Sequence, residues 1–110
     1  MAQSDQNFVD GPNYLRVLRE LDWNHSKTFE ERCRAVIEQA TGDPVLDLSS
    51  LAYLSSPAIK QVARAHIFAE EKGRHLTVRI SESLLKIFEV TRLDKVIALE
   101  VVRDQGKGKG

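Results

Sequence analysis

The sequence predicts an α/β domain in which helices pack on a mixed β-sheet of about four or five strands. Short apolar runs of strand length alternate along the chain with longer segments whose apolar residues recur at helical spacing. Because a helix between two strands usually makes a crossover connection, this alternation favours a largely parallel or mixed sheet. The length of 110 residues suits one compact domain and is too short for two.

The two ends of the chain differ in composition from the part between them. Residues 1–12, "MAQSDQNFVDGP", are mostly polar and end in Gly-Pro, so we expect a flexible N-terminal segment. Residues 103–110 end in "GKGKG" and are expected to form a flexible tail, because so many glycines disfavour folding. The folded domain is therefore predicted to span residues 13–102.

The first half of this domain reads as strand, helix and strand. "NYLRVLREL", residues 13–21, predicts one or two short strands. A change to helical spacing predicts a helix within residues 24–42, with Ser26 or Thr28 as its cap, Thr28 and Glu31 as a capping box, and Gly42 just past its end. The proline-led apolar run "PVLDLSSL", residues 44–51, fits a buried strand.

The second half repeats the alternation. A helix is expected after Ser56 and should end at Gly73. The remaining segments are predicted in order as a strand at 74–80, "RHLTVRI", a short helix at 81–93, "SESLLKIFEVTRL", and a last strand at 94–102, "DKVIALEVV".

Composition excludes several classes of function. The chain has 16 Lys and Arg and 16 Asp and Glu, a net charge of +0, which argues against a general nucleic-acid or membrane-surface binder. The single cysteine, Cys33, excludes an internal disulfide and a cysteine-built zinc site and is most simply a core residue. With no secretory signal and no apolar run near the ~20 residues that span a bilayer, we expect a cytoplasmic protein without membrane insertion.

The stretch "YLSSPAIKQ", residues 53–61, contains the most informative turn of the chain. Pro57 suits the start of a helix, because its missing N–H is not needed there, and this places Ser56 at the N-cap with Ser55 in the turn. A helix N-terminus also tolerates a phosphate, since it carries unpaired N–H groups and a partial positive charge. The turn can therefore be read either as a plain cap or as a phosphorylation switch.

Several motifs together resemble the STAS domain, the fold of bacterial anti-sigma factor antagonists. They are "LDLS" at 46–49, "YLSSPA" at 53–58, Gly73, "RLDKV" at 92–96 and, earlier, "RELDWNHSKTFEER" at 19–32. The resemblance covers roughly residues 13–102. This sequence departs from the family pattern at four positions: Ser55 replaces an aspartate, Pro57 a second Ser or Thr, Ala58 a glycine, and Arg92 a frequent glycine.

The resemblance implies a binding module that is not an enzyme and has no cofactor or metal. By position, Ser56 is the residue that a partner kinase phosphorylates, with Ser55 as the alternative acceptor. The implied partners are an anti-sigma factor of the serine protein kinase type and a PP2C-like phosphatase, acting on a monomer or weak dimer in a pathway that controls transcription or biofilm formation. The expected partner-binding residues are Ser55, Ser56, Pro57, Lys60, Gln61 and Arg64.

Two other readings stay open. A non-switched STAS scaffold subunit, as in stressosomes or lipid-transport complexes, is favoured somewhat by the loss of the aspartate. A small hydrolase could combine Ser56, a histidine and Asp47, but the Gly-x-Ser-x-Gly elbow is absent. His66 lies on a mostly apolar helix face and is expected to be packed, and no histidine pair has the spacing of a helical metal site. Trp23 is expected to be packed rather than a contact residue.

Overall fold

The computed structural model describes residues 7–21 and 25–103 and confirms the predicted α/β fold with a five-stranded mixed sheet. The strands are β1 (Phe8–Gly11), β2 (Tyr14–Val17), β3 (Val45–Leu48), β4 (Thr77–Ser81) and β5 (Ala98–Val102). The helices are α1 (Ser26–Gln39), α2 (Ser56–Glu71), α3 (Glu82–Val90) and a short 3-10 helix, η2 (Leu93–Lys95).

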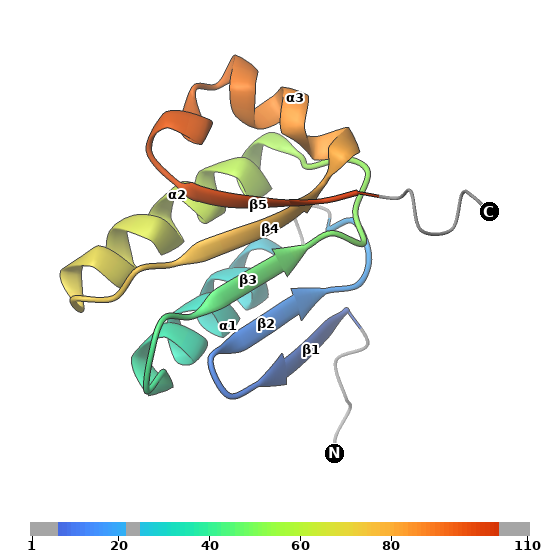
Figure 1. Ribbon diagram of the computed structural model, residues 1–110. Helices are drawn as coiled ribbons and strands as arrows, with labels where there is room; N and C mark the ends of the chain where they lie inside the picture. The colour runs from blue at the N-terminus through green and yellow to red at the C-terminus, as the bar shows by residue number, and fades with distance from the viewer. Residues whose placement is uncertain (1–6, 22–24, 104–110) are drawn as a thin grey trace.

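The strands lie in the sheet in their order along the chain, β1-β2-β3-β4-β5. β1 pairs antiparallel with β2, and every following pair is parallel. Helices α1 and α2 lie side by side across one face of the sheet, while α3 and η2 lie near β5 (Figure 1). The opposite face of the sheet carries no helix of the described chain.

Successive residues of each strand alternate between the two faces of the sheet. Leu46 and Leu48 of β3 and Val78 and Ile80 of β4 are buried against the helices, since successive side chains of a strand point to opposite faces. On the other face Asp47 lies between them on β3, and it is also buried, at 3% exposure. A buried carboxylate on an otherwise open face requires hydrogen-bond partners, which are described below.

The structure differs from the sequence prediction at the N-terminus. Residues 8–11, expected within a flexible segment, form the edge strand β1, and Phe8 is buried and stacks on Phe29 of α1 with 6.2 Å between ring centroids. The reason is tertiary: four residues carry too weak a periodic signal for a strand, and β1 is held by its pairing with β2.

Helix α1 also begins differently. It starts at Ser26 after His25 and has no side-chain cap, so the predicted caps and the Thr28–Glu31 capping box are not formed. The apolar residues at helical spacing form its buried face, with Phe29, Val36 and Ile37 in the core. Cys33 is a core residue too, and burial, with the nearby Glu30 charge, raises the pKa of its thiol.

Two helix ends use left-handed backbone. Gly73 follows α2 with φ of 74°, as its glycine predicts, and Arg92 follows α3 with φ of 64°. The position where the family often has glycine is therefore a left-handed one, which explains that preference physically. Among the described residues no helix is long and apolar enough to cross a membrane.

Candidate functional site

The turn before α2 assigns different roles to its two serines. Ser55 is the N-cap: its hydroxyl oxygen accepts a hydrogen bond from the Ala58 N–H at 3.2 Å, and its carbonyl accepts from the Ile59 N–H at 2.9 Å. Ser56 is already the first helical residue. The predicted cap at Ser56 is therefore wrong by one position, because proline is tolerated at the second helical position as well as the first.

Ser56 is exposed, and its hydroxyl has no hydrogen-bond partner within the described part of the chain. Pro57 beside it is exposed too. The capping oxygen and the accessible hydroxyl thus belong to different residues. A modification of the Ser56 hydroxyl would therefore not remove the hydrogen bond by which Ser55 caps α2.

The surface that follows the turn is basic. Lys60 and Arg64 are exposed and lie four residues apart on α2, so they share one face of the helix. Together with Lys27 and Glu30 of α1, they line an open groove of about 380 Å³ between the N-terminal halves of the two helices. Three positive side chains and one negative one give the groove a positive balance.

Gln61 does not project from this surface as the sequence prediction required. It is 7% exposed and lies between the two helices, where it lines the inner wall of the groove. Ile67, an apolar residue of the same helix, is 55% exposed. The helical period places both residues near the border between the two faces, and only the position of α1 decides which one is covered.

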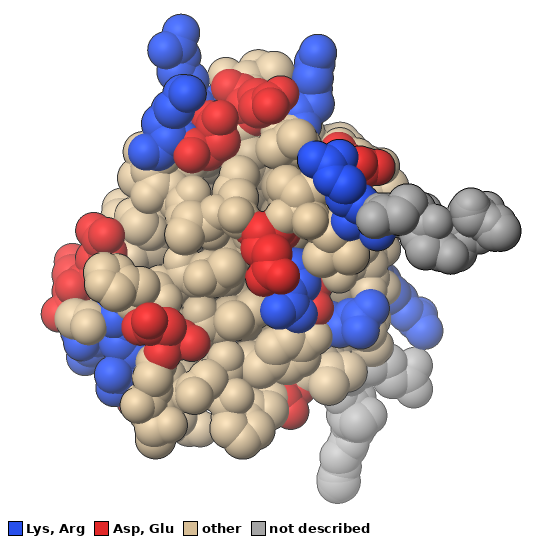
Figure 2. Space-filling model, in the orientation of Figure 1, with Lys and Arg blue, Asp and Glu red and all other residues tan. Residues whose placement is uncertain are grey.

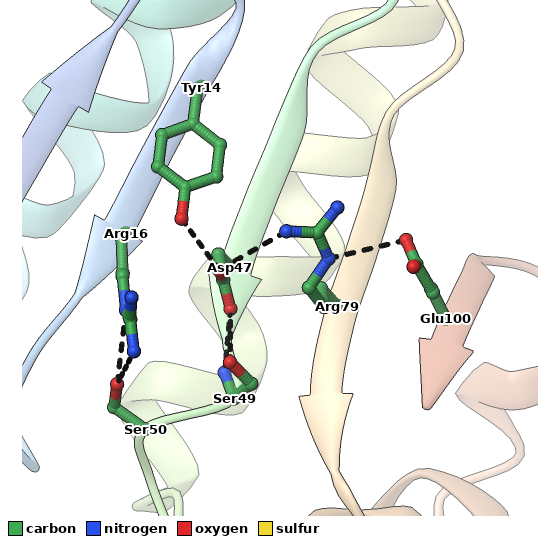
Figure 3. A network of polar contacts seen from close by, with 7 residues as sticks. All are labelled: Tyr14, Arg16, Asp47, Ser49, Ser50, Arg79 and Glu100. Atoms are coloured by element: carbon green, nitrogen blue, oxygen red, sulfur yellow. Dashed lines mark hydrogen bonds and ion pairs between the residues drawn. The ribbon is translucent and has the colours of Figure 1, made fainter. Parts of the chain in front are cut away.

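A polar network on the open sheet face was not anticipated from the sequence as a unit. Asp47 accepts hydrogen bonds from the Tyr14 hydroxyl at 2.7 Å and from the Ser49 N–H and hydroxyl at 2.9 and 2.6 Å. Arg79 lies 3.5 Å from the same carboxylate (Figure 3). The "DLS" motif therefore has a structural role: its serine folds back onto its aspartate at the end of β3.

The network sets the ionisation of Asp47. Burial by itself raises the pKa of this carboxyl, but the hydrogen bonds from Ser49 and Tyr14 and the charge of Arg79 outweigh burial and hold its pKa below the ordinary value. Burial, the hydrogen bond to Asp47 and its negative charge raise the pKa of Tyr14. Asp47 is thus a structural anion on the open face.

A Ser-His-Asp arrangement finds no support in this geometry. The four hydrogen bonds and ion pairs of Asp47 involve Tyr14, Ser49 and Arg79 and no histidine. His66 has a side chain only 12% exposed and lies 3.6 Å from Glu70, as expected for a packed histidine. No cluster of three metal-ligating side chains occurs within residues 7–21 and 25–103. Trp23 lies outside the described residues.

Comparisons with known proteins agree with this fold. A family model described as "Mlab, STAS domain" matches residues 5–102. Among solved structures, the chain is similar to a Thermotoga maritima protein described as a candidate anti-sigma factor antagonist (tm1081), with 13% identity and a TM-score of 0.69 over 88% of this chain and 84% of that one. No curated protein matches.

Proposed function

We propose that this chain, which belongs to the STAS domain family, is a protein-binding module that phosphorylation of Ser56 releases from its partner. The partner is an anti-sigma factor of the serine protein kinase type, which the unphosphorylated form captures. A PP2C-like phosphatase returns the module to its binding state. The chain itself performs no catalysis in this scheme.

The observation that carries the proposal is the division of roles between Ser55 and Ser56. Ser55 uses its oxygen to cap α2, whereas the Ser56 hydroxyl is exposed and without a partner in the described chain. A kinase can reach Ser56 without opening the helix. The phosphate would then stand at a helix N-terminus, where its charge of about −1.5 to −2 is tolerated.

The binding surface consists of the turn and the exposed face of α2, namely Ser55, Ser56, Pro57, Lys60 and Arg64, with Gln61 in the groove wall. Because Lys60 and Arg64 are positive, the complementary partner surface is acidic. A phosphate on Ser56 would face those acidic groups. A repulsion and desolvation cost of ~3 kcal/mol would weaken the complex by about two decades.

A second candidate is a STAS scaffold subunit that is not switched. The observation that favours it is that Ser55 stands where the family has an aspartate and uses its hydroxyl for the helix cap. The negative charge that could assist a kinase at Ser56 is therefore missing. Such a subunit would bind its neighbours through the same face irrespective of the state of Ser56.

One experiment separates these two functions. Intact-mass analysis of the protein from its native host, wild type beside Ser56→Ala, detects phosphorylation. A single phosphate that is lost in Ser56→Ala is expected, and capture of a serine kinase by Ser56→Ala but not by Ser56→Asp completes the test. Ser55→Ala is a poor control because it loses the cap, so Ser83→Ala, an exposed serine on α3, serves instead.

Equal capture of the same protein by Ser56→Ala and Ser56→Asp, with no phosphate found, would support the scaffold. A phosphate that persists in Ser56→Ala would move the modification to Ser55 or another residue. Either result would contradict the proposed role of Ser56.

A further inference from the structure

The sheet face that the helices leave uncovered carries a row of charges of alternating sign. Strand pairing places Arg16 of β2, Asp47 of β3, Arg79 of β4 and Glu100 of β5 directly beside one another. All four side chains lie on the same face of the sheet (Figure 3). From this order we infer that the face binds a second copy of this chain.

The row is self-complementary under a twofold axis. An axis parallel to the strands and midway between β3 and β4 carries the position of Arg16 onto that of Glu100, and the position of Asp47 onto that of Arg79. Each charge of one copy then faces the opposite charge of the other. This satisfies the requirement of an isologous interface, in which one patch must complement itself. Two twisted sheets stacked face to face with aligned strands are an established packing.

The two outer positions of the row are the ones open to a partner. Glu100 has a side chain 54% exposed, and Arg79 is its one ion-pair partner among residues 7–21 and 25–103. Arg16 is half-buried and donates to the Ser50 hydroxyl at 2.8 and 3.1 Å, and within the described part of the chain its positive charge has no carboxylate partner. In the dimer Arg16 meets Glu100 of the second copy at both ends of the row.

The centre of the row is already balanced within each copy. Asp47 is nearly covered, and Arg79 lies between it and Glu100, 3.5 and 3.3 Å away. Asp47 and Arg79 of one copy therefore form a neutral pair, and this pair is not repelled by the same pair of the second copy. Exposed apolar side chains lie beside the row on this face, with Val9 46% exposed and Val102 39% exposed. In Figure 2, charged side chains gather near the centre of this face and at its rim, and uncharged residues lie between them.

The face is small, and this limits the affinity. Five strands about 4.8 Å apart, each of four or five residues rising about 3.3 Å, give a footprint of about 20 by 15 Å. Interfaces of this size belong to weak and transient complexes, so we expect a Kd on the order of 100 µM. The fraction of dimer therefore depends strongly on the local concentration of the chain.

Charge reversal with complementation tests the dimer. Within one chain Arg16 and Glu100 are separated by three strand spacings, about 14 Å, and cannot pair with each other. Sedimentation velocity of the full chain from about 10 µM to about 1 mM should show self-association, and either Arg16→Glu or Glu100→Arg should raise Kd about tenfold or more. Each variant alone places like charges at both ends of the interface.

An equimolar mixture of the two variants restores opposite charges at both ends, so a heterodimer should form with nearly the wild-type affinity. Lys27→Glu, on the helix layer, changes the charge equally and should leave Kd unchanged; far-ultraviolet circular dichroism checks each fold. If Glu100→Arg fails to fold, Ala98→Arg, exposed on the same face, should also prevent the dimer.

A wild-type chain that stays monomeric to about 1 mM would overturn the inference. A dimer whose Kd these variants do not change would also overturn the inference, and so would a mixture of the two variants that stays monomeric. In either case the sheet face would bind a different protein or no protein. The result does not depend on Ser56, because Ser56 lies on the α2 side of the molecule. Ser56→Asp should dimerise like the wild type.

Discussion

The hydroxyl oxygen of Ser55 accepts a hydrogen bond from the backbone N–H of Ala58 at 3.2 Å. This contact closes the first turn of α2 and frees the neighbouring Ser56 hydroxyl for contact with another molecule. The residue that stabilises the helix start and the residue with the accessible hydroxyl are therefore different residues of the same turn.

Removing the cap should destabilise the protein, whereas removing the exposed hydroxyl should not. We expect Ser55→Ala to lower the free energy of unfolding by about 1 kcal/mol, because one N–H at the helix start loses its acceptor. Ser56→Ala should change it by less than about 0.5 kcal/mol, as is usual for an exposed residue. Urea denaturation of both variants measures the difference, and equal effects would contradict the assigned roles.

A negative charge at position 56 should leave the fold intact. Ser56→Asp is expected to raise the free energy of unfolding by about 0.3–1 kcal/mol at low salt, since a carboxylate at the helix N-terminus interacts favourably with the macrodipole. Ser56→Lys should lower it by a similar amount. Thermal unfolding at low and high salt checks both, and the two effects should shrink together as salt screens them.

Ionised Asp47 should contribute to stability above the ordinary carboxyl pKa. Because its pKa is lower in the folded state, its contribution is full at neutral pH and is lost as pH falls below about 4 and through the folded pKa. Asp47→Asn should cost about 1.5–3 kcal/mol at neutral pH, the usual worth of hydrogen bonds to a charged group. The variant should also lose less stability than the wild type between neutral pH and about pH 2, as followed by urea denaturation at several pH values.

The two left-handed residues at helix ends, Gly73 and Arg92, should respond in opposite ways when glycine is removed or introduced. Arg92→Gly should raise the free energy of unfolding by up to about 1 kcal/mol, because φ of 64° is costly for a side-chain-bearing residue. Gly73→Ala should lower it by about 1 kcal/mol through backbone strain alone, since a Cβ at this position meets nothing within 4 Å. Paired denaturation curves test this, and a destabilising Arg92→Gly would show that the arginine side chain matters more than its backbone.

The helices and the central strands were predictable because their signals are local. The period of apolar residues between Phe29 and Ile37 alone specifies a helix with one buried face, and the apolar run Val45–Leu48 alone specifies a buried strand. The glycine at position 73 likewise marks a helix end by its own conformational freedom. Strand β1 escaped prediction because its four residues are held by pairing and by the contact of Phe8 with Phe29.

The sequence located the candidate site, whereas the tertiary structure decided which of its residues are buried, exposed or hydrogen-bonded. The pattern Ser-Ser-Pro indicates a helix start, yet which serine caps depends on where the chain leaves β3 and how α2 lies on the sheet. The same holds for Gln61, which the neighbouring helix α1 covers. A periodic pattern identifies the two faces of a helix but not the exact border between them.

By itself, the sequence determined the alternation of strands and helices, the turn at Ser55–Pro57 and the balanced net charge, all of which depend on neighbouring residues or on composition. Only the tertiary structure decided that Asp47 is joined to Tyr14 and Arg79, which are 33 and 32 residues away. It also decided that Arg16, Asp47, Arg79 and Glu100 form one row. The reason is register: parallel pairing sets which residues lie side by side, and that register depends on the packing of the whole sheet against its helices.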